Sequence, residues 1–242
     1  MSLPEIVSRA EWRAARAALL DEEKAVTRAL DALRAERRRL PMVPVDREYV
    51  FEGGDGKATL LDLFQGRQQL VVHHFVFEPE WETGCRCCSA FLDQIGHLAH
   101  LHARRTTFAA VSRAPFTRIL PFKARMGWTV PWYSSQPGDF DADFGADFGA
   151  VSEEDGAAER GEMPGRPGVS CFLRDGDRVF HTYSAHGRGL EGLGSTTSLL
   201  DLTALGRQEP WEEPRGRANA LGAPARPEHP RYHDEYDDRH GQ

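Results

Sequence analysis

Apolar residues recur along the first forty positions at the spacing of a helix. Their intervals are three, four and seven residues, at Trp12, Ala15, Leu19, Val26, Leu30 and Leu33. This spacing predicts a helix, or two in succession, with one apolar stripe over residues 5–40. Ser8 followed by Glu11 has the pattern of a capping box, which marks the start of a helix. Pro41 and Pro44 predict its end.

Beyond this helix, apolar runs alternate between strand and helix character. Nearly continuous runs at 70–77 and 106–111 predict buried strands, because a strand covered on both faces has no polar side. The other runs predict strands at 49–51 and 130–135, helical segments at 60–64, 91–101, between Pro115 and Gly127 and within 190–205, and a hairpin of 169–173 with 178–183. The alternation predicts an α/β domain with a central mixed β-sheet flanked by helices. The strand at 70–77 is expected in its interior.

The chain divides by composition into three parts. They are an N-terminal helical extension at 1–44, the α/β domain at 45–206 and a C-terminal tail at 207–242. The tail is rich in Pro, Arg and acidic residues and poor in aliphatic ones, which predicts an extended or disordered segment with solvated histidines. Within the domain, the repeat Asp-Phe-Gly-Ala at 143–146 and 147–150 predicts a loop anchored by its two Phe.

Composition and charge limit the cellular location of the protein and the classes of partner that it can bind. With 242 residues, 40% of them hydrophobic, the chain can bury an ordinary core. A formal charge of −7 argues against generic binding of nucleic acid. No apolar run approaches the ~18 residues of a membrane span. Residues 1–10 lack the apolar core of a secretory signal, so a cytoplasmic protein is expected. The long N-terminal helix could support a homodimer.

Three of the four cysteines fall within four consecutive positions, in the stretch Trp-Glu-Thr-Gly-Cys-Arg-Cys-Cys-Ser at 81–89. A buried strand precedes this stretch and helical spacing follows it. Cys85 and Cys88 are therefore expected on one face of a helix's first turn. Unpaired backbone N–H groups, the helix dipole and Arg86 favour a thiolate there, and can lower its pKa from about 8.5 toward neutrality. Because disulfides in the cytosol are mostly catalytic or transient, a structural disulfide is not expected.

A metal site is an alternative use of these thiols. Zinc usually needs a second ligand pair, and the remaining cysteine, Cys171, lies alone in an apolar run. A soft-metal site for copper, or for zinc, remains open, with ligands drawn from Cys85, Cys87, Cys88 and His73. Its difficulty is that adjacent Cys87 and Cys88 cannot both point inward from one helix face.

Three features resemble the thioredoxin superfamily. The buried strand followed by Trp-x-x-Gly-Cys-x-x-Cys, ending at Cys88, resembles its redox loop. Pro167, shortly before the strand at 169–173, resembles the cis-proline that faces the disulfide in that superfamily. His74-Phe75 falls where thioredoxins often carry a buried Asp before Phe. The resemblance implies a thioredoxin-like fold.

A closer resemblance covers nearly the whole chain. Its motifs are Trp81-x-x-Gly84-Cys85-x-x-Cys88-Ser89, Ser112-Arg113-Ala114-Pro115, Gly127-Trp128, Ser134-Ser135, Asp143-Phe144 and Leu205-Gly206-Arg207. They are similar to the thioredoxin-like family filed as domain of unknown function 899. That resemblance implies the fold and no established reaction. The chain departs from such motifs at Cys87, a position that is usually small or polar.

The first functional hypothesis is a thiol–disulfide oxidoreductase that needs no cofactor. Cys85 would attack a protein or small-molecule disulfide, and Cys88 would resolve the mixed disulfide. By the resemblance, Pro167 would present its backbone to an extended substrate. His74 or His73 would relay protons.

Three further hypotheses stay open. Peroxidatic cysteines of this superfamily follow Pro-x-x-x-Thr-x-x-Cys; Pro79 and Thr83 have the first spacing, but Cys85 falls one position short. A copper or zinc protein would use the cysteine cluster as ligands. A binding module would retain the cysteines without turnover.

Overall fold

The computed structural model describes residues 4–136, 138–146, 167–203 and 232–235. Its strands are β1 (Val43–Pro44), β2 (Val50–Gly53), β3 (Gly56–Thr59), β4 (Gln69–His74), β5 (Thr106–Ser112), β6 (Trp132–Ser134), β7 (Gly168–Asp175) and β8 (Arg178–His186). They form one mixed sheet in the order β1-β8-β7-β4-β5-β6-β2-β3. β4 is parallel to β5 and antiparallel to β7. The strand that precedes the cysteines is therefore interior, as predicted.

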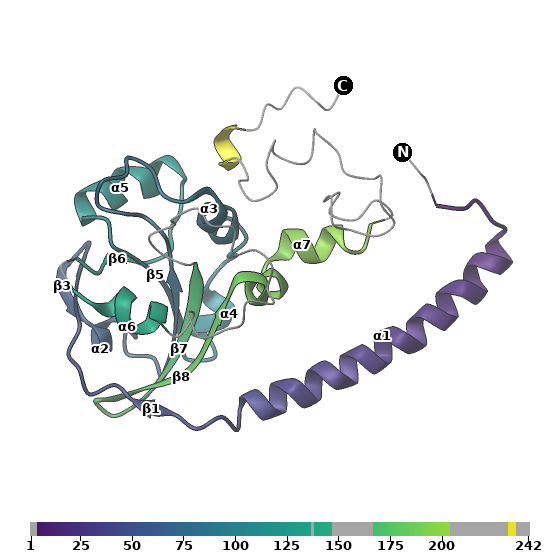
Figure 1. Ribbon diagram of the computed structural model, residues 1–242, viewed down its shortest axis with the longest axis horizontal. Helices are drawn as coiled ribbons and strands as arrows, with labels where there is room; N and C mark the ends of the chain where they lie inside the picture. The colour runs from purple at the N-terminus through teal and green to yellow at the C-terminus, as the bar shows by residue number, and fades with distance from the viewer. Residues whose placement is uncertain (1–3, 137, 147–166, 204–231, 236–242) are drawn as a thin grey trace.

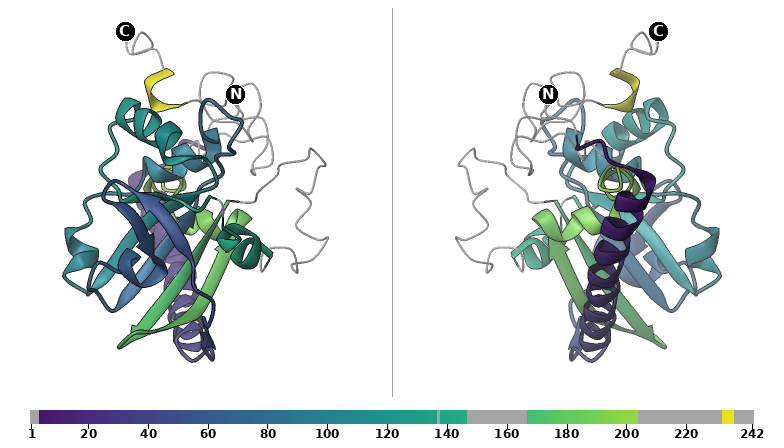
Figure 2. Two further views of the ribbon diagram at one scale, coloured as in Figure 1. Left: turned by 90° about the vertical axis from the view of Figure 1, so that its left-hand side faces the viewer. Right: turned by 90° about the vertical axis from the view of Figure 1, so that its right-hand side faces the viewer.

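Helices cover both faces of this sheet (Figures 1 and 2). They are α1 (Arg9–Arg37), α2 (Leu60–Leu63), α3 (Arg86–Leu92), α4 (Ala99–His102), α5 (Phe116–Arg125), α6 (Phe140–Ala146) and α7 (Ser195–Leu200), with 3₁₀ helices η1 (Gly187–Leu193) and η2 (His233–Glu235). One core cluster lies under α3 and α5, and a second lies under α2 and α6. This architecture is the expected thioredoxin-like fold. No described helix is long and apolar enough to cross a bilayer.

Side chains of β4 alternate between the two core clusters. Val71 and His73 face the cluster under α3 and α5. Val72 and His74 face the cluster under α2 and α6. Because both faces are covered, the strand reads as a nearly continuous apolar run.

The N-terminal helix α1 begins at the predicted capping box, in which Ser8 and Glu11 bond reciprocally. Figure 1 shows it running away from the sheet, and none of its residues is buried. Its C-terminal end meets the sheet, where the Arg37 guanidinium lies 4.3 Å from the centre of the Tyr183 ring. β1 pairs with β8, so the sheet begins at residues 43–44, just before the expected domain boundary.

The first copy of the repeat, residues 143–146, is helical and not part of a loop as expected, and the second copy lies outside the described residues. Phe140 and Phe144, four residues apart on α6, are both buried and pack around Tyr49 at centroid distances of 5.2 and 5.7 Å. Their spacing places both rings on one helix face. Phe148 lies outside the described residues.

The run predicted as a single helix at 91–101 is divided between α3 and α4. Its half-buried residues still pack on the core, at Ile95, Leu98 and Leu101. In the C-terminal tail, Tyr232 is buried at 4% exposure and η2 follows it, so the expectation of an extended or disordered tail is wrong for residues 232–235. The remainder of the tail lies outside the described residues.

Candidate functional site

One residue, Val76, holds both cysteines of the Cys-x-x-Cys pair. Its carbonyl oxygen accepts the Cys85 N–H at 2.9 Å. Its own N–H donates to the Cys88 sulfur at 3.4 Å. Val76 lies two residues after the end of β4, so the strand fixes where the loop and the first turn of α3 lie. Cys85 is the N-cap of α3, one position before the helical turn on which it was expected.

The residue just before Cys85 packs so closely on the core that only glycine, Gly84, fits there. A Cβ at this position would lie 2.4 Å from the Phe75 ring and 2.9 Å from the Phe122 ring. Both contacts are shorter than real Cβ atoms make. The glycine therefore brings the loop down onto the aromatic core and sets the entry of the chain into α3.

The site favours a thiolate at Cys85. Hydrogen bonds from the thiols of Cys87 and Cys88 lower the pKa of Cys85 well below its ordinary value. Burial opposes this shift; it is a smaller effect than either thiol hydrogen bond but a larger one than the backbone N–H groups of Cys87 and Cys88, which also lower the pKa of Cys85. Donors to the charged form stabilise it. At physiological pH, Cys85 is therefore ionised and nucleophilic.

Cys88 has the opposite character. It is 1% exposed, and burial raises its pKa; the hydrogen bond to Cys85 and the charge of that thiolate raise it further. The pair thus consists of an ionised outer sulfur and a protonated inner one. All four cysteines are free thiols in this structure.

His73 is buried beside α3. Its side chain is fully inaccessible, and its ring lies 4.6 Å from that of Phe91 on α3. Nδ1 lies 3.1 Å from the carbonyl oxygen of Gly168. Since a carbonyl only accepts, Nδ1 carries the proton, and Nε2 is left with a lone pair.

The environment of His73 keeps it neutral. Among the described residues its Nε2 has no hydrogen-bond partner. Burial lowers its pKa to about 4, although the charge of Cys85 acts in the opposite direction. The structure therefore brings together Cys85, Cys88 and His73, and it supplies His73 as an unoccupied proton acceptor.

His74 lies on the other face of the sheet. Its Nε2 is 2.8 Å from the Ser170 hydroxyl, its Nδ1 is 3.4 Å from Asp141, and its ring stacks on Phe140. The structure therefore does not bring this histidine together with the cysteines.

Residues 1–236 match the family model described as bacterial protein of unknown function (DUF899). The chain belongs to the DUF899 family. No curated protein sequence matches it.

Several solved structures are similar to this DUF899 chain. Peroxidoxin BcpB from Mycobacterium tuberculosis is 17% identical, with a TM-score of 0.39 over 62% of this chain and 85% of its own. Peroxiredoxin Q from Xanthomonas campestris is 16% identical, with a TM-score of 0.38 over 60% and 88%. A proposed thiol:disulfide interchange protein DsbE from Chlorobium tepidum is 14% identical, with a TM-score of 0.37 over 64% and 93%.

Pro167 lies at the cysteine end of the DUF899 sheet. It immediately precedes Gly168, the first residue of β7, which pairs with His74 at the end of β4. The resemblance to the cis-proline strand predicts a cis Arg166–Pro167 bond, and this bond involves Arg166, which lies outside the described residues.

The alternative metal site has no support from the geometry. Within the described part of the DUF899 chain, no three His, Cys, Asp or Glu side chains are arranged to hold a metal ion. The sulfur of Cys88 instead receives the Val76 N–H. Cys171 lies on β7, and burial raises its pKa.

Two residues of the DUF899 site, Glu78 and Tyr232, were not predicted from the sequence. Glu78 is buried beyond β4; burial raises its pKa, and it pairs with Arg113 at 3.0 Å. Tyr232 donates its hydroxyl to the Gly84 carbonyl at 2.5 Å. The available signals were an acid directly after a buried strand, and an aromatic residue within an otherwise polar tail.

Proposed function

We propose that this DUF899 protein is a thiol–disulfide oxidoreductase. The observation that carries the proposal is the placement of one Cys-x-x-Cys pair at the start of α3, with Cys85 at the N-cap and Cys88 1% exposed beneath it and bonded to the Val76 N–H. The pKa is accordingly lowered at Cys85 and raised at Cys88. Such a pair divides the roles of attacking and resolving thiol. The chemistry runs between sulfur atoms, so no metal or organic cofactor is required. We place the activity in the cytoplasm.

In the first step, the Cys85 thiolate attacks one sulfur of a substrate disulfide. A mixed disulfide between Cys85 and that sulfur forms, and the second substrate sulfur leaves as a thiolate. In the second step, the Cys88 sulfur attacks Cys85, which expels the first substrate sulfur. The substrate gains two electrons, and the Cys85–Cys88 pair loses them as it becomes a disulfide.

Cys88 must lose its proton before the second step. The Cys85 charge that raises its pKa disappears once Cys85 is in the mixed disulfide. The nearby His73 has a lone pair on Nε2 without a hydrogen-bond partner among the described residues, and we assign it the transfer of this proton; with a pKa of about 4 it passes the proton on and does not retain it. His73 therefore takes the relay role in this proposal, and His74 does not.

The substrate is a disulfide small or extended enough to reach Cys85, a residue that is 9% exposed. Pro167, at the start of β7, is placed at the same end of the sheet, where it would present backbone to an extended segment. Protein disulfides and small disulfides are both consistent with this arrangement.

The test follows reduction of a small aromatic disulfide by full-length protein. Cys85→Ser is expected to abolish turnover, and Cys88→Ser is expected to trap a mixed disulfide that mass spectrometry detects on Cys85. Cys171→Ser is the matched control and should keep full activity. Activity that survives Cys85→Ser would overturn the proposal. Turnover of hydrogen peroxide and not of the disulfide would replace it with peroxide reduction.

A further inference from the structure

We infer that Tyr232 is a positioning residue of the cysteine site. Residues 232–235, which we name the C-terminal strap, attach it to the domain. The inference deepens the proposed function and rests on it as far as catalysis is concerned. The contacts that Tyr232 makes do not depend on that function.

Tyr232 fixes the peptide group that enters Cys85. Its hydroxyl donates to the carbonyl oxygen of Gly84 at 2.5 Å and lies 3.2 Å from the Thr83 hydroxyl. The N–H of the same peptide group, on Cys85, donates to Val76. Both polar ends of the Gly84–Cys85 peptide are therefore held in a buried place. A buried carbonyl that lost its donor would be destabilised.

The Tyr232 ring also holds side chains around the loop. It packs edge-on against Phe122 with centroids 5.7 Å apart, and Phe122 is one of the rings on which Gly84 rests. The guanidinium of Arg86, the residue after Cys85, lies 4.4 Å from the Tyr232 ring centre. Tyr232 thus touches the residues on both sides of Cys85.

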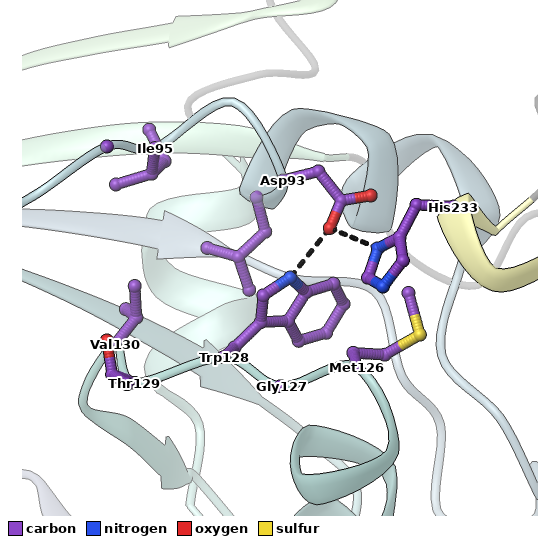
Figure 3. A pocket seen from close by; sticks show the side chains of 10 residues that line it. Asp93, Ile95, Met126, Gly127, Trp128, Thr129, Val130 and His233 are labelled. Carbon is purple, nitrogen blue, oxygen red and sulfur yellow. Dashed lines mark hydrogen bonds and ion pairs between the residues drawn. The ribbon is translucent and has the colours of Figure 1, made fainter.

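Two polar anchors bind the strap to the domain. Arg125 on α5 makes paired bonds to the Asp234 carboxylate at 2.7 and 2.8 Å. Paired guanidinium–carboxylate bonds fix orientation as well as distance. Asp93, at the end of α3, accepts the Trp128 indole N–H and meets His233, each at 2.7 Å, as Figure 3 shows. The strap therefore ties the cysteine helix to α5.

These contacts give the strap a function at Cys85. The thiolate depends on N–H and S–H groups of the first turn of α3, so its stabilisation depends on how Cys85 enters that turn. Without the Tyr232 hydroxyl, the Gly84–Cys85 peptide is held only at its N–H end, by Val76, and the donors converge less closely on the Cys85 sulfur. Tyr232 thereby acts through Cys85 and not on the substrate.

The test compares Tyr232→Phe with the wild type in the full-length chain. The variant keeps the ring and removes the hydroxyl. Alkylation of Cys85 by iodoacetamide, followed from neutral pH down through the pKa of the Cys85 thiol, should slow by about two- to ten-fold at pH values below that pKa, the range that one hydrogen bond supplies. Exchange of the Cys85 amide hydrogen should become faster. Tyr183→Phe is the matched control, because an Arg guanidinium also lies over the Tyr183 ring. It should change neither the alkylation rate nor the amide exchange.

Two outcomes separate the inference from the proposed function. If wild-type Cys85 alkylates no faster than a free thiol, the proposed function fails, and amide exchange alone then decides whether Tyr232 holds the loop. If wild-type Cys85 is reactive and Tyr232→Phe leaves both alkylation and exchange unchanged, the inference is overturned. Asp234→Asn gives a second arm, because it loosens the strap without touching Tyr232 and should shift both readouts in the same direction.

Discussion

His73 and His74 are neighbours in the chain, yet they lie on opposite faces of the sheet. His73 packs against Phe91 of the cysteine helix, and His74 stacks on Phe140 of α6. A strand alternates its side chains, so only one of two adjacent histidines can reach the cysteines. The structure assigns that place to His73.

Burial of His73 makes folding sensitive to acid. Its pKa is about 4 in the folded chain, against an ordinary value of 6.5. Between these values the unfolded chain binds a proton that the folded chain does not, so the stability present above pH 6.5 is lost as the pH falls toward 4. The loss is on the order of 2–3 kcal/mol. Urea unfolding at pH 7 and pH 5 should show it.

Substitution isolates the contribution of that residue. His73→Gln should unfold with a weaker pH dependence over this window, because the amide does not titrate. His100→Gln, at an exposed position of α4, should retain the dependence of the wild type. Equal slopes for the wild type and His73→Gln would contradict the burial of a neutral His73.

Much of the fold follows from periodicity alone. The capping box at Ser8 and the hairpin after Pro167 are found where the sequence predicts them, and the strand predicted at 70–77 is interior but ends at His74. Each depends on local spacing or on a turn. The faces of the two histidines were not resolved, because a strand that is apolar on both sides carries no alternation from which its register can be read.

Gly84 offers a test of how tightly the loop is packed. Gly84→Ala places a methyl group against Phe75 and Phe122, with too little space for either ring to remain in place. Overpacking of this kind costs about 1–3 kcal/mol of unfolding free energy. Gly96→Ala is the matched control, because a Cβ there meets nothing within 4 Å. Chemical denaturation should separate the two, and equal stabilities would contradict the close packing.

The apolar stripe of α1 is expected to pair with a second copy of the chain. Leu19 and Val26, seven residues apart, are 51% and 58% exposed on a helix with no buried residue. A repeat of seven residues is typical of helices that pack together. Leu19→Glu with Val26→Glu should reduce the mass measured by sedimentation to that of a monomer. Leu20→Glu lies about 100° around the helix and should leave the mass unchanged.

Two results would contradict this predicted pairing of two copies. A wild-type chain that sediments as a monomer at tens of micromolar would show that the stripe does not join two copies. A double variant that retains the wild-type dimer mass would place the interface elsewhere.

The C-terminal tail shows which contacts local composition cannot predict. Residues 232–235 belong to a polar tail by composition, yet Tyr232 is 4% exposed because Gly84, Phe122 and Arg86 provide a place for it. These partners lie more than a hundred residues earlier, and no local pattern links them. Tertiary contact determines such elements, so they could not be predicted from spacing.

Cys87 is expected to tune Cys85 and not merely to accompany it. The hydrogen bond from its side chain is the largest of the effects that lower the Cys85 pKa. Cys87→Ala removes that donor and should raise the Cys85 pKa, so that alkylation slows most at pH values below the new pKa. Above it, both proteins are thiolates, and the variant should react as fast as the wild type or slightly faster, since nucleophilicity rises with pKa.

Cys87→Ser restores a donor at the same position. Its hydroxyl should return the Cys85 profile most of the way to that of the wild type, although the shorter C–O bond places the donor differently. Mass-spectrometric mapping of alkylated Cys85 from pH 4 to 9 distinguishes the three proteins. A Cys87→Ala profile that superimposes on the wild type would show that Cys87 is a bystander. A Cys87→Ser profile that matches Cys87→Ala would show that the thiol contributes by some means other than donating a hydrogen bond.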